Sequence, residues 1–188
     1  SLQQVHMRAQ LLGDEEAALG VVAETEVESI LALLERDPPD LLVIDSIQTL
    51  YSRELNSAPG AVAQLRECAA LLVRFAKQRG VAIFLVGHVT KEGVIAGPRV
   101  LEHMVDTVLY FEADPGGRLR MIRAAKNRFG AVNEIGFFAM ADTGLKEVRN
   151  PSALFLARDS VPTPGSTVLV TREGSRSVLV EVQALVDR

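Results

Sequence analysis

The sequence predicts an α/β protein with a mainly parallel sheet, flanked by helices and extended by antiparallel edge strands. In the first half of the chain, short apolar runs alternate with helical patterns, as expected where crossover helices join parallel strands. In the second half, apolar residues recur at every second position between turn signals, which is typical of hairpins. With 188 residues, of which 48% are hydrophobic, the chain is long enough to bury one full core.

The N-terminal part of the chain contains two predicted helices and a short strand. Residues 1–12 carry apolar side chains at helical spacing but begin without a capping residue, so the segment looks cut from something longer. The apolar run at residues 19–23 suggests a strand. Residues 25–35 follow as an amphipathic helix, with Thr25 as the predicted N-cap and Pro38 closing the segment.

Two buried strands and a long helix come next. The apolar residues of the strand predicted at 41–45 run directly into Asp45, which is typical of a buried parallel strand. Residues 61–79 place apolar side chains on one face, which predicts a core helix that Gly80 ends. Residues 81–86 supply the next buried strand.

The second half of the chain is predicted to be antiparallel. Turn signals at Asp114-Pro-Gly-Gly117 and Asp142-Thr-Gly144 separate segments with period-two alternation. We expect strands at residues 107–112, 119–126, 133–140 and 145–148.

A change in composition marks the C-terminal part. Ser, Pro, Thr and Gly dominate residues 158–166, which indicates a linker. Residues 167–171 and 177–182 then form a predicted hairpin with its turn at Glu173-Gly174. An isolated hairpin is marginally stable, so these strands are expected to begin another domain. We therefore predict two domains, residues 1–158 and residues 159–188.

Composition excludes several classes of protein. The longest apolar runs are about one strand long, far short of the roughly 20 residues of a membrane helix, and the N-terminus carries no recognisable secretory signal. The single cysteine, Cys68, excludes an intramolecular disulfide and argues against a cysteine-ligated metal. These features predict a cytoplasmic protein without a membrane partner.

The charge is unevenly distributed. The net charge of −4 does not by itself indicate a nucleic-acid-binding protein. Basic residues nevertheless gather within eleven positions, at Arg118, Arg120, Arg123, Lys126 and Arg128. Such a run is more often a solvated strand face than an anion-binding surface, and both interpretations stay open here.

Asp45 is the first candidate functional residue. An aspartate at the carboxyl end of a buried strand is how a Walker B strand presents its carboxylate to nucleotide-bound magnesium. The same pattern arises where an aspartate merely caps the next turn, and the strand alone does not decide between the two.

A glycine-rich loop at residues 87–99 follows the second buried strand. Open α/β sheets bind ligands at the carboxyl ends of their strands, which makes His88 a candidate. An isolated histidine is nevertheless more often a hydrogen-bonded turn residue. His103 is expected to be structural. Three histidines without cysteines or paired ligand spacing predict no zinc site.

The segment Lys126-Asn-Arg-Phe-Gly130 follows one predicted strand and precedes another. Two cations that flank an amide, before an aromatic residue and a glycine, suit a turn that directs lysine and arginine at a phosphate or carboxylate. Taken alone, the segment could equally be a plain charged hairpin.

Five segments of the chain together match a single pattern. They are Val43-Ile-Asp-Ser-Ile-Gln-Thr49, Ser57-Ala-Pro-Gly60, Val86-Gly-His-Val-Thr-Lys-Glu-Gly93, Ala96-Gly-Pro-Arg-Val-Leu-Glu-His-Met-Val-Asp-Thr-Val-Leu-Tyr110 and Lys126-Asn-Arg-Phe-Gly130. This pattern resembles the RadA (Sms) family of bacterial DNA repair proteins, relatives of the RecA recombinase. The motifs cover roughly residues 40–130, and the last is a hallmark of that family.

The resemblance implies a RecA-like ATPase core that uses ATP and magnesium and works as a hexameric ring on DNA. The implied activity couples ATP hydrolysis to branch migration of recombination intermediates. Single-stranded DNA and the RecA recombinase are the implied partners.

The resemblance also implies roles for nucleotide-site residues. Asp45 takes the Walker B role and holds the magnesium shell through water, with Ser46 beside it at the nucleotide. His88 occupies the sensor position that detects the γ-phosphate. Lys126 and Arg128 reach the nucleotide of a neighbouring subunit and stabilise charge at its phosphates.

DNA-binding residues are implied in the same way. Lys91 and Arg99 lie in the loop after the second buried strand, where RecA-like proteins meet single-stranded DNA. Arg53 lies in the second such region, at residues 52–60 after Asp45.

The chain departs from the family in what it lacks. The family's four-cysteine zinc module and Gly-rich P-loop precede the segment that starts here at Ser1, as does the catalytic glutamate. Only the opening hairpin of a Lon-protease-like domain is expected within residues 159–188. A central strand position of the sheet would be left open. We therefore expect the 188-residue chain alone to bind ATP very weakly and not to hydrolyse it.

Two other functions stay open. The chain could be a non-catalytic ATPase-like module that has lost its P-loop and docks onto DNA or onto ring subunits. Asp45, Lys126 and Arg128 retain the residue types that catalysis requires, which favours a piece of a working enzyme. Another RecA-family role, such as a replicative helicase or a circadian-clock ATPase, is disfavoured by the segments at 87–93 and 126–130.

Overall fold

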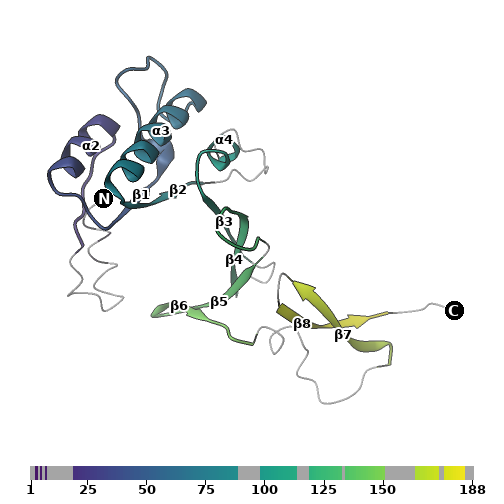
Figure 1. Cartoon of the computed structure of the whole chain (residues 1–188). Coiled ribbons are helices and arrows are strands. Elements are labelled where there is room, and N and C mark those ends of the chain that lie inside the picture. Colours follow the sequence, from purple (N-terminus) through teal and green to yellow (C-terminus); the bar gives the residue numbers. More distant parts are fainter. Residues whose placement is uncertain are drawn as a thin grey trace. The chain divides into compact units, whose positions relative to one another are not determined.

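A computed structural model of the chain falls into two compact units, Ser1–Asp106 and Thr107–Arg188 (Figure 1). Each is described by itself. The structure describes residues 3, 5, 7, 19–88, 98–113, 119–132, 134–150, 164–173 and 176–184.

The first unit is built on two parallel strands, β1 (Leu41–Asp45) and β2 (Ala82–Val86). They pair in register from Leu41 opposite Ala82 to Asp45 opposite Val86. Because the strands are parallel, both carboxyl ends lie at one edge, where Asp45 is the last residue of β1. The strands predicted at 41–45 and 81–86 are confirmed to within one residue.

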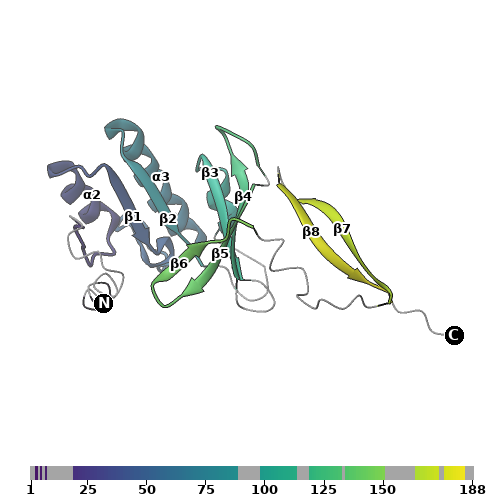
Figure 2. The same ribbon diagram turned by 90° about the horizontal axis from the view of Figure 1, so that it is seen from below.

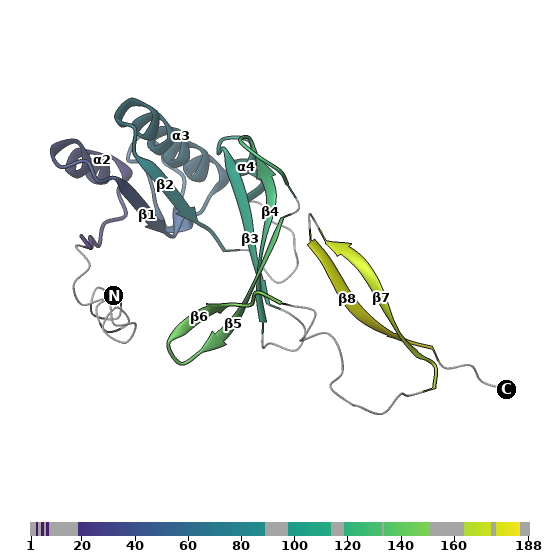
Figure 3. The same ribbon diagram turned by 60° about the horizontal axis from the view of Figure 1, so that its bottom comes forward.

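Two helices, α2 (Val27–Arg36) and α3 (Val62–Arg79), cover one face of this strand pair (Figures 1 and 3). Alternate strand residues point at them, because side chains of a strand alternate between its two faces. A short helix, α4 (Pro98–Glu102), adds Leu101 to the same core. The buried core residues of this unit are Val27, Ile30, Ile44, Ile47, Leu50, Leu65, Cys68, Ala69, Leu72 and Leu101.

The predicted end of the long helix is also confirmed. Gly80 follows α3 with a φ of 72°, in the left-handed region, and its N–H donates to the carbonyl of Ala76 at 2.8 Å. Glycine adopts this conformation without the steric penalty of a Cβ atom.

The start of α2 differs from the prediction. Residues 19–23 form no strand, and Thr25 does not cap the helix, which begins after Glu26. The chain is instead held extended by a parallel bridge between Glu26 and Tyr51, whose N–H donates to the carbonyl of Thr25 at 3.0 Å. The apolar run lacks a partner strand among the described residues, and Thr25 lies outside the helix because of the bridge. The helix predicted at 1–12 lies largely outside the described residues.

The second unit contains four antiparallel strands in the order β3 (Thr107–Ala113), β4 (Leu119–Asn127), β5 (Ile135–Ala141) and β6 (Gly144–Glu147). These strands form a sheet of their own among the described residues, and they confirm the predicted antiparallel segment. The predicted turn between β5 and β6 is confirmed, with Gly144 at a φ of 97°. The turn signal at residues 114–117 lies outside the described residues.

A separate antiparallel hairpin consists of β7 (Ser166–Glu173) and β8 (Arg176–Gln183), which twist around each other (Figure 2). It confirms the two C-terminal strands that the sequence predicts. Most of the expected linker, as well as Gly174, lies outside the described residues, and the domain boundary near residue 158 stays a prediction. No helix in the described part of the chain is long and apolar enough to cross a membrane.

Candidate functional site

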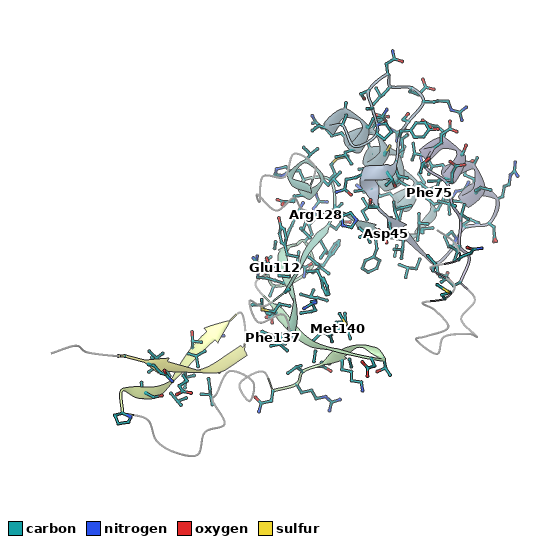
Figure 4. All side chains as sticks on the ribbon, turned by 180° about the vertical axis from the view of Figure 1, so that it is seen from behind. Asp45, Phe75, Glu112, Arg128, Phe137 and Met140 are labelled. Atoms are coloured by element: carbon teal, nitrogen blue, oxygen red, sulfur yellow. The ribbon has the colours of Figure 1, made fainter. Side chains whose placement is uncertain are left out.

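Asp45 lies at the carboxyl edge of the parallel strand pair, opposite Val86 (Figure 4). The residue is exposed, whereas the next residue, Ser46, is buried and is joined to it by a cis peptide bond. The carboxylate is therefore presented to solvent at the edge where open α/β sheets bind ligands.

A single turn of 3-10 helix, η1 (Ile47–Thr49), holds Asp45 at this edge. Ile47 is fully buried in the core beneath α3. Thr49 donates twice to the Ser46 carbonyl, from its N–H at 3.1 Å and from its hydroxyl at 2.8 Å. The chain after Asp45 is thus anchored by the buried side chain of Ile47 and by the hydrogen bonds between Thr49 and Ser46.

Gln48 links the carboxyl ends of β1 and β2. Its Nε2 donates to the backbone carbonyl of His88 at 3.1 Å. A Cβ atom at Gly87 would lie 3.5 Å from the same nitrogen, so the amide packs directly over the end of β2. The Oε1 atom of Gln48 is buried without a hydrogen-bond partner among the described residues. This acceptor lies next to Gly87, at the end of β2.

His88 is exposed immediately beyond β2. The structure therefore places Asp45, Ser46 and His88 at one edge of one unit, as the sequence predicts. Gln48 joins them through its bond to His88.

The loop after η1 is anchored to α3 by one buried amide. Gln64 is only 1% exposed, and its Oε1 accepts the N–H of Ser52 at 2.7 Å. The two N–H groups of its Nε2 are shared among the carbonyl groups of Ser52, Leu55 and Ser57, whose oxygens lie 3.2, 3.1 and 2.9 Å from that nitrogen. This loop is one of the two predicted DNA-binding regions, the one at residues 52–60.

Arg53, the predicted DNA-binding residue of this loop, forms an ion pair with Glu26, with Nε and Oε1 2.7 Å apart. Its side chain is 60% exposed. The adjacent Ser52 hydroxyl donates to the Glu28 carboxylate. Burial raises the pKa of Glu28, but the Ser52 bond, backbone N–H groups and the Arg53 charge outweigh it and hold that pKa below its usual value. Glu26 and Glu28 thus fix the base of the loop.

The two remaining DNA-binding candidates are not placed in detail. Lys91 lies outside the described residues. The backbone of Arg99 belongs to α4, but its side chain also lies outside the described part of the chain. Both assignments stay predictions.

The lysine and arginine of the segment 126–130 belong to the second unit, where Figure 4 labels Arg128. Lys126 pairs with Val108 across the β3–β4 ladder, and Arg128 follows the end of β4 in an exposed turn. Phe129 in this turn is 83% exposed. The turn thus presents a cation and an aromatic ring to solvent.

The basic run in β4 is partly neutralised. Arg123 pairs with Glu112 at 3.1 Å and lies over the ring of Tyr110, 5.5 Å from its centroid. Arg123 therefore fits the solvated strand face, whereas Arg128 lies beyond the strand.

Comparison with known proteins decides the family. A family model described as an AAA domain matches residues 1–94, which is half of the chain. The chain belongs to this AAA domain family. The crystal structure of the RadB recombinase aligns with a TM-score of 0.49 and 18% identity, covering 65% of this chain and 59% of that one.

The predicted resemblance to RadA is confirmed over the whole chain. The DNA repair protein RadA of Pseudomonas aeruginosa is 65% identical over 187 residues, which cover 100% of this chain and 41% of that protein. RadA of Escherichia coli is 55% identical with the same coverage, and RadA of Bacillus subtilis is 51% identical, covering 99% and 41%. The chain thus spans about two fifths of the length of these relatives.

The AAA domain chain offers one carboxylate that fits a magnesium ion. Magnesium keeps several waters and binds through one or two carboxylates together with substrate phosphates, and Asp45 supplies such an exposed carboxylate. Among the described residues, no group of three or more His, Cys, Asp or Glu side chains could hold a metal. Asp45 therefore suits an ion that is held through water. The zinc expectation concerns a four-cysteine module, and this chain has one cysteine.

Sequence reasoning missed Gln48 and Gln64 as functional supports. For Gln48, its place just after the end of the strand is the signal that could have been used. Gln64 is a polar residue beside Leu65 in the predicted helix, and nothing in the sequence marks it as buried. Both act through partners that are distant along the chain.

Proposed function

We propose that the chain is part of an ATP-dependent DNA repair and recombination motor that binds single-stranded DNA and drives branch migration of recombination intermediates. The observation that carries this proposal is the position of Asp45, at the carboxyl edge of β1 and beside the Gln48–His88 link, in a chain of the AAA domain family. The names of the RadA relatives, which are DNA repair proteins, supply the process.

At the nucleotide, Asp45 holds water molecules of the magnesium shell, with Ser46 behind it. Magnesium, when bound, neutralises charge on the β- and γ-phosphates of ATP. His88 senses the γ-phosphate, and Gln48 holds the backbone of His88 to the turn that carries Asp45. A change at the phosphate is thereby transmitted from His88 into the loop that contains Lys91.

Lys126 and Arg128 act on the nucleotide of a neighbouring copy in a hexameric ring. Fixed cations at a phosphate stabilise the charge that develops during transfer, and such residues are worth about 10³ to 10⁵ in rate. We expect Arg128→Ala to lower ATP turnover of the full-length protein by about 100-fold or more.

At the DNA, Lys91, Arg99 and Arg53 contact the phosphates of a single strand. Arg53 is held in place by Glu26 and keeps an exposed guanidinium. The RecA recombinase is the proposed protein partner, since both would act on the same recombination intermediates.

The test measures binding of fluorescent single-stranded DNA by the purified chain as salt is raised. The slope of log K against log salt is negative, and each lost phosphate contact makes it less steep by about 0.7 for single strands. We expect this decrease in Lys91→Ala and Arg99→Ala, and no change in Lys146→Ala, which removes an exposed cation of β6. Equal slopes in all variants, or no binding at low salt, would overturn the DNA assignment.

A non-catalytic module that docks onto DNA or onto ring subunits is the second candidate. The two functions differ in the full-length protein. A motor should lose about 100-fold or more of its ATP turnover with Asp45→Asn, as expected when a charge-stabilising group is removed. A full-length protein without turnover would favour the docking module.

A further inference from the structure

The turn after β4 is tied to its own asparagine. Asn127, the last residue of β4, accepts the N–H of Phe129 on its Oδ1 at 3.1 Å. Its Nδ2 donates to the carbonyl of Ala131 at 3.4 Å. One side-chain amide therefore bonds to the backbone on both sides of Gly130.

Gly130 leaves the room that this amide occupies. A Cβ atom at Gly130 would lie 2.9 Å from Nδ2 of Asn127, closer than real Cβ contacts allow. The φ of Gly130 is not in the left-handed region where glycine is favoured, so the backbone itself would accept alanine. Alanine is excluded only while the Asn127 amide keeps its place. The two residues act as a unit, which we call the Asn127–Gly130 clamp.

The clamp sets the course of the residues between its members. Arg128 and Phe129 are both exposed, and no buried side chain of the turn fixes their backbone. Hydrogen bonds of an asparagine to backbone groups a few residues ahead are a common way to order such a turn. Asn127 thus contributes to the direction in which Arg128 leaves the backbone.

We propose that Asn127 is a positioning residue that, with Gly130, holds the turn so that Arg128 meets the phosphates of a nucleotide on a neighbouring copy. This inference rests on the proposed function of Arg128. Asn127 is assigned to positioning because each end of its amide bonds to the backbone of the turn. A displacement of about 1 Å in a catalytic group can lower a rate about 100-fold.

The first experiment measures ATP turnover and thermal unfolding of the full-length protein. Asn127→Ala is expected to lower kcat about 10-fold or more with less than about a 3-fold change in KM for ATP, since it misplaces a group used in the transition state. Gly130→Ala should have a similar effect, because its methyl group displaces the amide. Asn150→Ala, at an exposed asparagine of the same unit, is the matched control and should leave kcat unchanged.

The double variant tests the clamp itself. If alanine at 130 is harmful only because it displaces Asn127, then Asn127→Ala with Gly130→Ala should be no slower than Asn127→Ala alone. Independent, multiplying losses would overturn the clamp. If Asn127→Ala fails to fold, Gly130→Ala still decides: a lower kcat at an unchanged melting temperature supports the clamp, and an unchanged kcat refutes it.

Mixing of subunits separates the clamp from general structural support. Asp45→Asn subunits mixed with Asn127→Ala subunits should regain turnover, because some interfaces then join an intact Asp45 to an intact turn. Asn127→Ala mixed with Arg128→Ala should not regain it. Recovery in neither mixture, or in both, would refute a shared role of Asn127 and Arg128.

The two levels of the proposal fail differently. Normal turnover in Arg128→Ala would overturn the proposed function and the clamp with it. Loss in Arg128→Ala but not in Asn127→Ala would overturn the clamp alone.

Discussion

Replacement of Gln64 by methionine removes the amide that anchors the loop after Asp45 to α3, while keeping the length of the side chain. Gln64 is 1% exposed and Ser52 is fully buried, so water does not replace the lost amide at Ser52. The N–H of Ser52 loses its partner, whereas the carbonyl of Ser52 keeps the N–H of Leu55 at 3.3 Å. The carbonyl groups of Leu55 and Ser57 belong to half-buried residues and can turn to solvent.

The expected loss of stability follows from these contacts. Leaving a buried donor or acceptor without a partner costs about 1–3 kcal/mol, and the N–H of Ser52 is therefore expected to cost about 1–3 kcal/mol. The other two carbonyl groups add little, because water can reach them. A typical protein is stable by about 5–15 kcal/mol, so this single change removes a large share of the total.

Urea unfolding of the purified chain, followed by circular dichroism, measures the free energy of unfolding. Gln78→Met is the matched control, because Gln78 is exposed on the same helix and a surface substitution there should change stability by less than about 0.5 kcal/mol. Gln64→Glu keeps the shape and the acceptor for the Ser52 N–H, but at neutral pH it buries a charged oxygen against the carbonyl groups that the amide nitrogen contacts. It should therefore lose at least as much stability as Gln64→Met.

A loss below about 1 kcal/mol in Gln64→Met, or one equal to that in Gln78→Met, would refute the reasoning. It would mean that the loop is held by other contacts. The Gln64 bonds would then be incidental to the position of Arg53.

Two further predictions concern ionisable groups. The pKa of Glu28 is lowered from its usual value of 4.5, so the ionised carboxylate stabilises the fold at pH values above about 4.5. This stability is lost as the pH falls through the lowered pKa of the folded state. Below about pH 4.5, the free energy of unfolding, measured with urea, should therefore fall less in Glu28→Gln than in the unchanged chain. Equal decreases in the two chains would contradict this. Burial, with the charges of Glu28 and Glu67, raises the pKa of Cys68 to about 11, so the folded thiol should react with a disulfide reagent at pH 8 about 100-fold or more slowly than the unfolded one. Equally fast labelling of folded chain would refute this.

The parallel pair and its long helix could be predicted from sequence because their signals are local. Apolar runs of strand length, an apolar helix face and a glycine after the helix each report on a few adjacent residues. The end of β1 at Asp45 and the left-handed Gly80 were predicted in this way and are confirmed.

The failed expectations involved partners. Residues 19–23 have the composition of a strand, but a strand exists only where another strand accepts its hydrogen bonds. Thr25 is a good N-cap residue in isolation, yet the bridge between Glu26 and Tyr51 holds the chain extended there and moves the helix start. The partner residues lie far along the chain and leave no local mark.

The sequence by itself determined the α/β class, the family and the identity of the candidate residues, because strand periodicity and the order of motifs depend only on consecutive residues. Only the tertiary structure decided how these residues are supported. Gln48 reaches His88 across forty positions, Gln64 anchors the loop of Arg53, and the Asn127 amide excludes a side chain at Gly130. A polar side chain shows its chemistry in the sequence, but its partner is chosen by packing, which brings distant backbone groups within hydrogen-bonding distance.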